Sequence, residues 1–412
     1  DKLTSVSITG SDKVTTTTIG ANTTDKLATV SVTGAKAVSV GNIGGDSTKL
    51  STVTLTSTTD ALAIGNIGSA ATNVDALSVD LNAVKDITVT AGNIDSKKIG
   101  TITADSTNGS VEIGAIGASA TEIGDITINA KDEVVTGLIG HATAKATSVG
   151  TISMTSTYGY IDVDDINVQD ATGLTVNLSA KTFIGKDTTA STALAIKNQG
   201  SITSSIAGAA KANVDYTVAT ANGTVNLTAT NTGGLKSTID NNATAGDGST
   251  STVSLGNAKS GEKNEVTFTG TVDTLNVTGG TGVDEIAITT TNVKNGTIAL
   301  GTGANQLSIT DGANGVAINL GSTTVTFDSG ETYTTTVAAG KAVEYVTTAG
   351  AKKVIDNGFD FTVSGVTKFV GTGFADYIVA NAEGTTITGG AGADKIVLGA
   401  GKDTILRNGD GT

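Results

Sequence analysis

Cysteine, proline and tryptophan are absent from this sequence of 412 residues, and histidine and arginine occur once each, as His141 and Arg407. Without cysteine the chain can form no disulfide and no thiolate metal site. One histidine excludes a multi-histidine zinc site, and no G-x-S-x-G nucleophile motif stands near it. Since proline is missing, the turns must be built from Asn, Asp and the 54 glycines.

The charge balance and the hydrophobic pattern exclude two kinds of partner. The net charge is −14, which opposes nucleic-acid binding because that needs a cationic surface. No apolar run approaches the roughly 20 residues of a membrane-spanning helix, and no N-terminal signal peptide is visible. We therefore expect no nucleic-acid partner and no insertion into a membrane.

Aromatic residues make up only 3% of the chain, and Val, Ile, Ala and Thr dominate the apolar and β-forming positions. That composition is typical of strands around a narrow core. Between residues 1 and 205, apolar residues with similar surroundings recur every 23 to 26 positions. They are Ile8, Val32, Leu55, Val79, Ile102, Ile126, Ile152, Val176 and Ile202. Each lies in a segment of period two, so we predict an all-β fold that begins as a parallel β-solenoid with one coil of about 24 residues per repeat.

A second strand is expected in most of these repeats, as in AVSVGNIG at 37–44 and ALAIGNIG at 61–68. The G-N-I-G segments predict turns with stacked Asn or Ile side chains. Residues 206–370 are predicted to form a second β or solenoid region. Within it, the polar stretch 231–253 predicts a long loop or a domain junction, and the aromatic-rich part of 326–370 predicts a more compact β segment.

The most specific pattern is the nonapeptide G-G-x-G-x-D-x-U-x, where U is a large apolar residue. Residues 389–397 (GGAGADKIV) and 279–287 (GGTGVDEIA) match every defined position, and 398–406 (LGAGKDTIL) loses only the first glycine. Each unit combines a tight glycine turn with a short strand, and the Asp carboxylate beside backbone carbonyls provides the hard oxygens that Ca²⁺ prefers. If two units make one turn, positions 18 apart stack, which places Asp376 with Asp394 and Thr385 with Asp403.

On these residues the chain resembles the RTX (repeats-in-toxin) proteins, which bind Ca²⁺ and leave the cell by type I secretion. The resemblance is close over 371–412 and implies a secreted protein with a calcium-binding β-roll there, truncated in this chain. The ligands that it implies are Asp376, Gly390, Gly392, Asp394, Gly399, Gly401 and Asp403, with Gly280, Gly282 and Asp284 as an upstream set. The alternative is a ladder of glycine turns without metal. The expected domains are therefore 1–205 (solenoid), 206–370 (with one RTX-like unit near 279–287) and 371–412 (β-roll).

An acidic, cysteine-free solenoid rich in Thr, Ser, Ala and Gly, followed by RTX units, also resembles the type I-secreted surface-layer proteins of Gram-negative bacteria. The resemblance implies a cell-surface protein that assembles with copies of itself into a calcium-dependent two-dimensional lattice, held to a surface polysaccharide by a region outside this chain. An RTX adhesin is the alternative. A polysaccharide-active enzyme and an ice-binding protein fit less well, because Asp162, Asp164 and Asp165 fit a solvated face better than a catalytic site and the outward residues form no strict Thr array. We expect no enzymatic activity.

Overall fold

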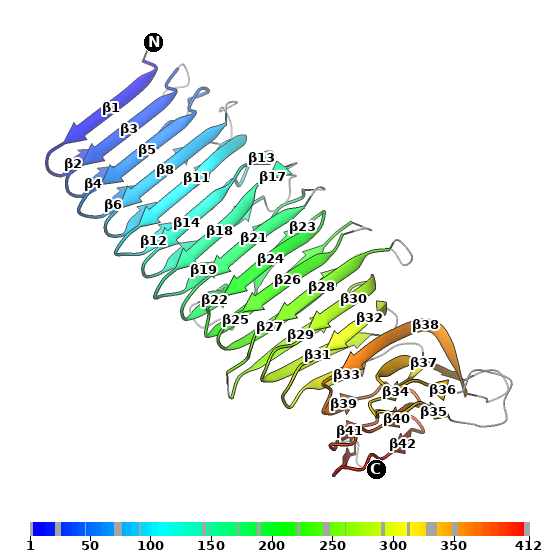
Figure 1. Cartoon of the computed structure of the whole chain (residues 1–412). Coiled ribbons are helices and arrows are strands. Elements are labelled where there is room, and N and C mark those ends of the chain that lie inside the picture. Colours follow the sequence, from blue (N-terminus) through cyan, green and yellow to red (C-terminus); the bar gives the residue numbers. More distant parts are fainter. Residues whose placement is uncertain are drawn as a thin grey trace. The chain divides into compact units, whose positions relative to one another are not determined.

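The structure is a computed structural model of the whole chain, and the residues that it describes form strands and no helices (Figure 1). It describes all residues except 1–2, 21–25, 46, 70–75, 90–91, 142–145, 147, 171–172, 188–190, 221–222, 242–247, 260, 290–292, 311–313, 327–335, 348–352 and 408–412, and only the backbone at 346–347 and 353–358. Within the described part, no helix is long and apolar enough to cross a membrane. The contacts divide the chain into two units, Asp1–Thr220 and Ala221–Thr412, and each is taken by itself.

Unit 1 is a parallel β-solenoid, as the sequence predicts. Its first ladder contains β1 (Ser5–Gly10), β3 (Thr29–Gly34), β5 (Thr52–Ser57), β8 (Leu77–Ala83), β11 (Lys98–Ser106), β14 (Ile126–Ala130), β18 (Thr151–Ser156), β21 (Leu174–Ser179) and β24 (Ile202–Ala207), with the short β13 (Glu122–Ile123) and β17 (Ser148–Val149) beside it. Ser5 pairs with Thr29 and Ile8 pairs with Val32, so one coil separates the residues that the repeat relates. Figure 1 shows these strands side by side in chain order. The predicted solenoid and its coil length are confirmed.

The second ladder of unit 1 contains the shorter strands that follow each long one. They are β2 (Val14–Thr16), β4 (Val38–Val40), β6 (Leu62–Ile64), β9 (Ile87–Val89), β12 (Val111–Ile113), β15 (Val134–Thr136), β19 (Ile161–Val163), β22 (Phe183–Gly185) and β25 (Lys211–Val218). Val38 pairs with Val14 on one side and with Leu62 on the other. The second strand expected in each repeat is therefore present.

A third row of contacts closes each coil of unit 1 at the segments predicted to be turns. It contains β7 (Ile67–Gly68), β10 (Ile94–Asp95), β16 (Ile139–Gly140), β20 (Asp165–Asn167) and β23 (Leu194–Asn198). Ile43 pairs with Ile67 through an isolated bridge, and Ile67 pairs with Ile94. Beside this isoleucine row, the Asn66 N–H donates to Asn42 Oδ1 at 2.9 Å. Stacked Asn and Ile at the G-N-I-G segments are confirmed.

The core of unit 1 is formed by stacked aliphatic side chains, because alternate residues of each strand point inward. In β5, Val53 and Leu55 are fully buried, whereas Thr54 between them is partly exposed. We expect Leu55→Ala to reduce the free energy of unfolding by about 2–5 kcal/mol, since it removes methyl groups from a packed ladder. Thr54→Ala, on the solvent face, should change it by less than about 0.5 kcal/mol. Chemical denaturation measures both, and equal effects would contradict this view of the core.

Unit 2 also forms parallel ladders, and its coils shorten along the chain, from the step between Lys236 and Glu265 to the step between Val266 and Ile286. The first contains β26 (Val225–Thr230), β28 (Thr250–Leu255), β30 (Val272–Thr278), β32 (Val293–Ala299) and β38 (Lys353–Ser364), and the second contains β27 (Gly234–Asn241), β29 (Lys263–Phe268), β31 (Val283–Thr289), β33 (Gln306–Thr310), β39 (Lys368–Val370), β41 (Thr386–Thr388) and β43 (Thr404–Leu406). Glu285 pairs with Gln306, a smaller step along the chain than the step from Ser5 to Thr29. The coils therefore become shorter than those of unit 1.

The prediction of a long loop over 231–253 is wrong in part, because β27 occupies residues 234–241 and β28 begins at Thr250. Leu235 and Ile239 alternate inward with Ser237 and Asn241, and all four are buried. One polar group on this inner face has a partner, since Asn241 Nδ2 donates to the Ser251 hydroxyl, whereas Ser237 Oγ and Asn241 Oδ1 are buried without one. Polarity alone therefore misidentified an inner strand as a loop.

An insertion interrupts the solenoid of unit 2 between β33 and β38. Its strands are β34 (Gly315–Asn319), β35 (Val325–Thr326), β36 (Thr336–Val337) and β37 (Lys341–Thr347), and β37 pairs antiparallel with both β34 and β38. The insertion shares a small core with β40 (Tyr377–Val379): Ala317, Val337 and Tyr345 from the insertion pack with Tyr377 and Val379. Because of it, Asn295 in β32 pairs with Asp360 in β38, which is far beyond one coil in the sequence. The compact β segment predicted within 326–370 is thus part of an antiparallel insertion between two coils.

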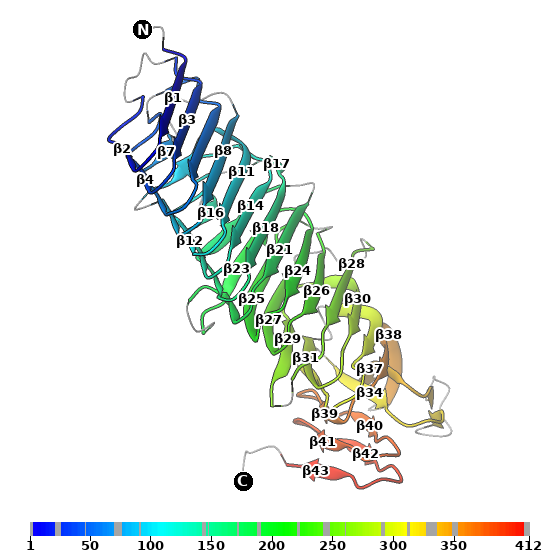
Figure 2. The same ribbon diagram turned by 60° about the vertical axis from the view of Figure 1, so that its left-hand side comes forward.

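After the insertion the coils shorten again. Lys368 pairs with Thr386, and Thr386 pairs with Thr404, so each step spans two nonapeptides. On the other side, β40 (Tyr377–Val379) pairs with β42 (Lys395–Val397) at the same spacing. Figure 2 shows β39, β41 and β43 beside β40 and β42. One coil here holds two nonapeptides, while the assignment of this segment as a calcium-binding RTX roll stays a prediction.

Candidate functional site

The nonapeptide turns stack in two rows. In one row, Asp376 precedes β40 and Asp394 precedes β42, so the pairing of these strands places the two acids in adjacent coils. In the other row, Thr385 precedes β41 and Asp403 precedes β43. The structure therefore brings together the residue pairs that the nonapeptide spacing predicts, with two carboxylates in the first row and one in the second.

One oxygen of each Asp holds the preceding coil through a backbone hydrogen bond. The Asp376 N–H donates to Asp394 Oδ1 at 3.0 Å, and the Thr385 N–H donates to Asp403 Oδ1 at 2.8 Å. Asp376 makes the same bond one coil earlier, since the Val316 N–H donates to its Oδ1 at 2.7 Å. These aspartates therefore tie successive coils together whether or not a metal is bound.

The other carboxylate oxygen closes the glycine turn itself. The Thr372 N–H donates to Asp376 Oδ2 at 2.8 Å, and the Gly399 N–H donates to Asp403 Oδ2 at the same distance. The donor stands four positions before the acid in both cases. The spacing in G-G-x-G-x-D thus follows from the size of the turn that the Asp must close.

Two asparagines of unit 2 make the coil-to-coil bond without a charge. The Asp284 N–H donates to Asn305 Oδ1 at 3.0 Å, and the Leu235 N–H donates to Asn264 Oδ1 at 3.2 Å. Asn305 also donates from Nδ2 to the Leu300 carbonyl at 2.7 Å. An amide is sufficient for this structural role, so the negative charge of Asp at the equivalent positions requires another explanation.

The negative charge of Asp376 and of Asp284 is energetically unfavourable because both side chains are buried. Burial raises the pKa of Asp376 to about 6, against the lowering effect of its hydrogen bonds, and the Asp394 carboxylate raises this pKa further. Burial also raises the pKa of Asp284. The Gly280 N–H faces this second carboxylate and lowers its pKa, but no donor meets hydrogen-bonding geometry at Asp284 Oδ2, which is buried. Both acids carry a charge that the described protein groups do not fully compensate.

Glycine is required where the turns of the first row approach each other. Gly390 has φ of 100°, and a Cβ there would lie 1.7 Å from the Thr372 carbonyl oxygen of the neighbouring turn. We expect Gly390→Ala to destabilise unit 2 by at least about 2 kcal/mol, because positive φ and this clash add. Urea denaturation of unit 2 measures the loss, and Ala391→Gly, which adds no Cβ at this contact, is the control. An unchanged midpoint in Gly390→Ala would contradict the packing of these turns.

The oxygen atoms in the two rows of turns are of the kind that calcium binds. Carboxylate oxygens of Asp376 and Asp394 stand in the same row as the predicted Gly390 and Gly392, and carbonyl oxygens of the neighbouring turn face those glycines. Asp403 with Gly399 and Gly401, and Asp284 with Gly280 and Gly282, form similar turns with one carboxylate each. Among the described residues, no group of three or more His, Cys, Asp or Glu side chains is placed to hold a metal ion. Any calcium here would therefore depend on backbone carbonyls for most of its roughly six to eight ligands, and the ten proposed ligands stay a prediction.

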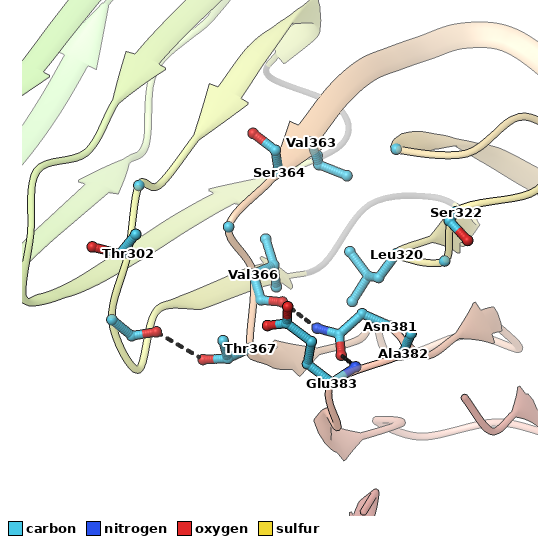
Figure 3. Close-up of a pocket in the computed structure, with 15 residues that line it drawn as sticks. Thr302, Leu320, Ser322, Val363, Ser364, Val366, Thr367, Asn381, Ala382 and Glu383 are labelled. Carbon is cyan, nitrogen blue, oxygen red and sulfur yellow. Dashed lines mark hydrogen bonds between the residues drawn. The ribbon is translucent and has the colours of Figure 1, made fainter. Parts of the chain in front are cut away.

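A pocket of about 510 Å³ lies beside the second row, where the insertion meets the solenoid. Sequence reasoning missed it. Figure 3 shows side chains from three turns that are distant in sequence, with Thr302 on the first, Val366 and Thr367 on the second and Asn381 and Glu383 on the third. No local pattern in the sequence indicates the pocket, because its walls come from turns that are far apart in the chain.

The residues considered for catalysis lie in neighbouring coils of unit 1. The backbone N–H of His141 donates to the Asn167 carbonyl at 3.0 Å in the third row of contacts. Asp165 forms an ion pair with Lys186 at 3.2 Å. Burial and the charges of Asp164 and Asp187 raise the pKa of Asp162. These contacts are those of an acidic surface with one lysine.

Comparisons with protein-family models, with curated proteins and with solved structures found no match for this chain.

Proposed function

We propose that the chain is a structural protein of a bacterial cell surface, secreted by the type I route, which assembles with copies of itself into a calcium-dependent two-dimensional lattice. The observation that carries the proposal is the use of Asp where Asn is sufficient. Asn264 and Asn305 hold the adjoining coils with neutral amides, whereas the buried Asp376 and its partly buried neighbour Asp394 do so with carboxylates. A bound cation is the simplest compensation for such charges.

Calcium would supply positive charge and oxygen coordination between adjacent turns. The chain supplies the rest: Asp376 and Asp394 present carboxylates in one row, Asp403 presents one in the other, and the glycine turns bring carbonyl oxygens close to them. Because these groups come together only in the folded coils, calcium binding would favour folding. A net charge of −14 keeps copies apart until cations reduce their repulsion, so assembly would also depend on calcium.

The solenoid of unit 1 suits a subunit of a two-dimensional lattice better than it suits an enzyme. Its outer faces carry Thr, Ser, Asn and Asp on regularly spaced strands, with exposed ion pairs such as Lys36–Asp12 at 2.8 Å and Lys85–Asp60 at 2.9 Å. Each pair contributes little by itself. Regular, polar, rigid surfaces of this kind suit many weak contacts between identical copies, which is what a lattice requires.

Negative-stain electron microscopy of the purified chain tests the proposal. With millimolar calcium we expect ordered sheets, and after addition of a chelator we expect them to dissolve. Because single exposed charges contribute little, Asp240→Asn in β27 should assemble as the unmodified chain does. Single particles under both conditions would overturn the lattice and favour the alternative, an RTX adhesin that acts as a monomer.

A further inference from the structure

The pocket at the insertion is built from rigid parts of unit 2. Its walls come from the turns after β32, β38 and β40 and from the ends of the insertion at 320–322 and Gly340. Backbone hydrogen bonds fix these walls: the Leu320 N–H donates to the Val379 carbonyl at 2.9 Å, and the Val363 N–H donates to the Gly340 carbonyl at 2.7 Å. A pocket held in this way exists before a ligand arrives, which lowers the cost of binding.

The size and the lining point to a small polar molecule. A volume of about 510 Å³ lies within the range of ordinary ligand sites. Four hydroxyl side chains, one amide and one carboxylate line it, together with four aliphatic side chains: Thr302, Ser322, Ser364, Thr367, Asn381, Glu383, Leu320, Val363, Val366 and Ala382. The part of the lining that the structure describes contains no Lys, Arg or His. Phosphates and other anions therefore have no cation to pair with, and a purely apolar ligand would leave the polar groups without partners.

Asn381 and Glu383 differ in how free their side chains are to bind. Asn381 Nδ2 donates to the Val366 carbonyl at 3.2 Å, and its Oδ1 accepts from the Glu383 N–H at 3.0 Å. These bonds fix the turn that carries Glu383. The Glu383 side chain is exposed and lines the pocket beside Val366 (Figure 3). An ionised carboxylate is an acceptor only, so it suits a ligand that offers several hydroxyl donors.

We propose that this pocket binds a neutral saccharide, with the Glu383 carboxylate accepting hydrogen bonds from adjacent sugar hydroxyls. The hydroxyls of Thr302 and Ser364 can donate to sugar oxygens or accept from sugar hydroxyls. The Thr367 hydroxyl donates to the Asn305 carbonyl at 3.1 Å, so it can only accept from the sugar. The aliphatic wall of Leu320, Val363 and Val366 faces the C–H groups of the ring. The site needs neither the lattice nor a bound metal for this recognition, so it stands apart from the proposed assembly.

Isothermal titration calorimetry of the full chain, at fixed calcium concentration, tests the site with maltotriose, mannotriose and N,N′,N″-triacetylchitotriose. Trigalacturonate serves as an acidic comparison. We expect at least one neutral trisaccharide to bind and the acidic one not to bind, because Glu383 repels carboxylates. Binding of trigalacturonate in preference to all three neutral probes, or no binding by any neutral probe up to about 10 mM, would overturn the proposal.

Two variants locate the binding. Glu383→Gln, which keeps the shape but loses the charged acceptor, should weaken binding roughly tenfold. Ser364→Tyr, at an exposed position of the lining, should fill the pocket and abolish binding. Glu262→Gln is the matched control, since Glu262 is exposed elsewhere in unit 2. Circular dichroism verifies the fold of each variant, and unchanged binding in both pocket variants would place the saccharide elsewhere and overturn the assignment.

Discussion

Replacing Asp394 and Asp403 together by Asn is expected to remove the stabilisation of unit 2 by calcium while leaving the metal-free chain folded. An Asn side chain can still accept the backbone bonds from Asp376 and Thr385, as Asn305 does for Asp284. At position 403 it loses only the second bond, from the Gly399 N–H, which should cost about 1 kcal/mol. It cannot provide the negative charge that calcium requires. At a calcium concentration about one hundred times Kd, the lost stabilisation would be about 2.7 kcal/mol.

The corresponding double Ala variant (the Ala pair) distinguishes the contribution of the charge from that of the hydrogen bonds. Asp394→Ala with Asp403→Ala loses the acceptors as well as the charge, which should cost the metal-free chain about 1–3 kcal/mol more for each N–H left without a partner. We expect both pairs of variants to lose calcium-dependent sheets in electron microscopy. Only the Ala pair should also lower the denaturation midpoint strongly in chelator.

Urea denaturation with calcium and with chelator gives the numbers for both pairs. Asp240→Asn, an exposed acid in β27, controls for the loss of a charge in unit 2. If the Asn pair kept the full calcium-dependent shift of the unmodified chain, Asp394 and Asp403 would not be ligands. The two aspartates would then be structural acceptors alone.

The solenoid could be predicted from the sequence because a strand alternates its faces with period two. Val32, Leu55 and Val79 recur at nearly regular intervals, and the structure pairs Val32 with Leu55 and Leu55 with Leu81. The last pairing differs from the expected one by two positions, since the coil between them is longer. A shift of two keeps the same side chains inward, so the error in register did not alter the predicted core.

The stacked Asn and Ile side chains of the third row were predicted, but its strand pairing and the pocket depend on features that local patterns do not contain. Ile43 and Ile67 belong to short strands or bridges inside segments that resemble turns, and only stacking makes them a ladder. The pocket depends on the pairing of Asn295 with Asp360, across an insertion whose length hides the repeat. The spacing in the sequence shows which residues can stack, but it does not show with which coil the chain pairs after the insertion.

At the nonapeptides, the motif predicted which residues stack but not what their oxygens do. The pairing of Asp376 with Asp394 in adjacent coils follows from the spacing of two nonapeptides. The bond from the Val316 N–H to Asp376 could not be predicted, because Val316 lies in the insertion, outside the nonapeptide spacing. A carboxylate can accept the backbone hydrogen bonds and also bind a metal ion, since each oxygen carries two acceptor sites.

The pH dependence of stability should reverse when calcium is added. Burial raises the pKa of Asp376 from an ordinary 3.8 to about 6 in the folded chain, so the folded state binds its proton more tightly than the unfolded state does. The stability from this group is therefore complete below pH 3.8 and is lost as pH rises through about 6. A shift of about two units corresponds to about 3 kcal/mol, and burial of Asp284 acts in the same direction.

With calcium present, the ionised carboxylates become the binding form, so the stabilisation by the metal grows as the same protons are lost. We expect unit 2 to be more resistant to urea at pH 4.5 than at pH 7 in chelator, and more resistant at pH 7 than at pH 4.5 in calcium. Asp376→Asn should flatten most of the first dependence, because the variant has no proton to lose. Asp240→Asn, whose side chain is exposed, should keep both dependences. If stability in chelator rose with pH between 4.5 and 7, the cost of the buried charge would be absent, and with it the main reason for placing a cation between these turns.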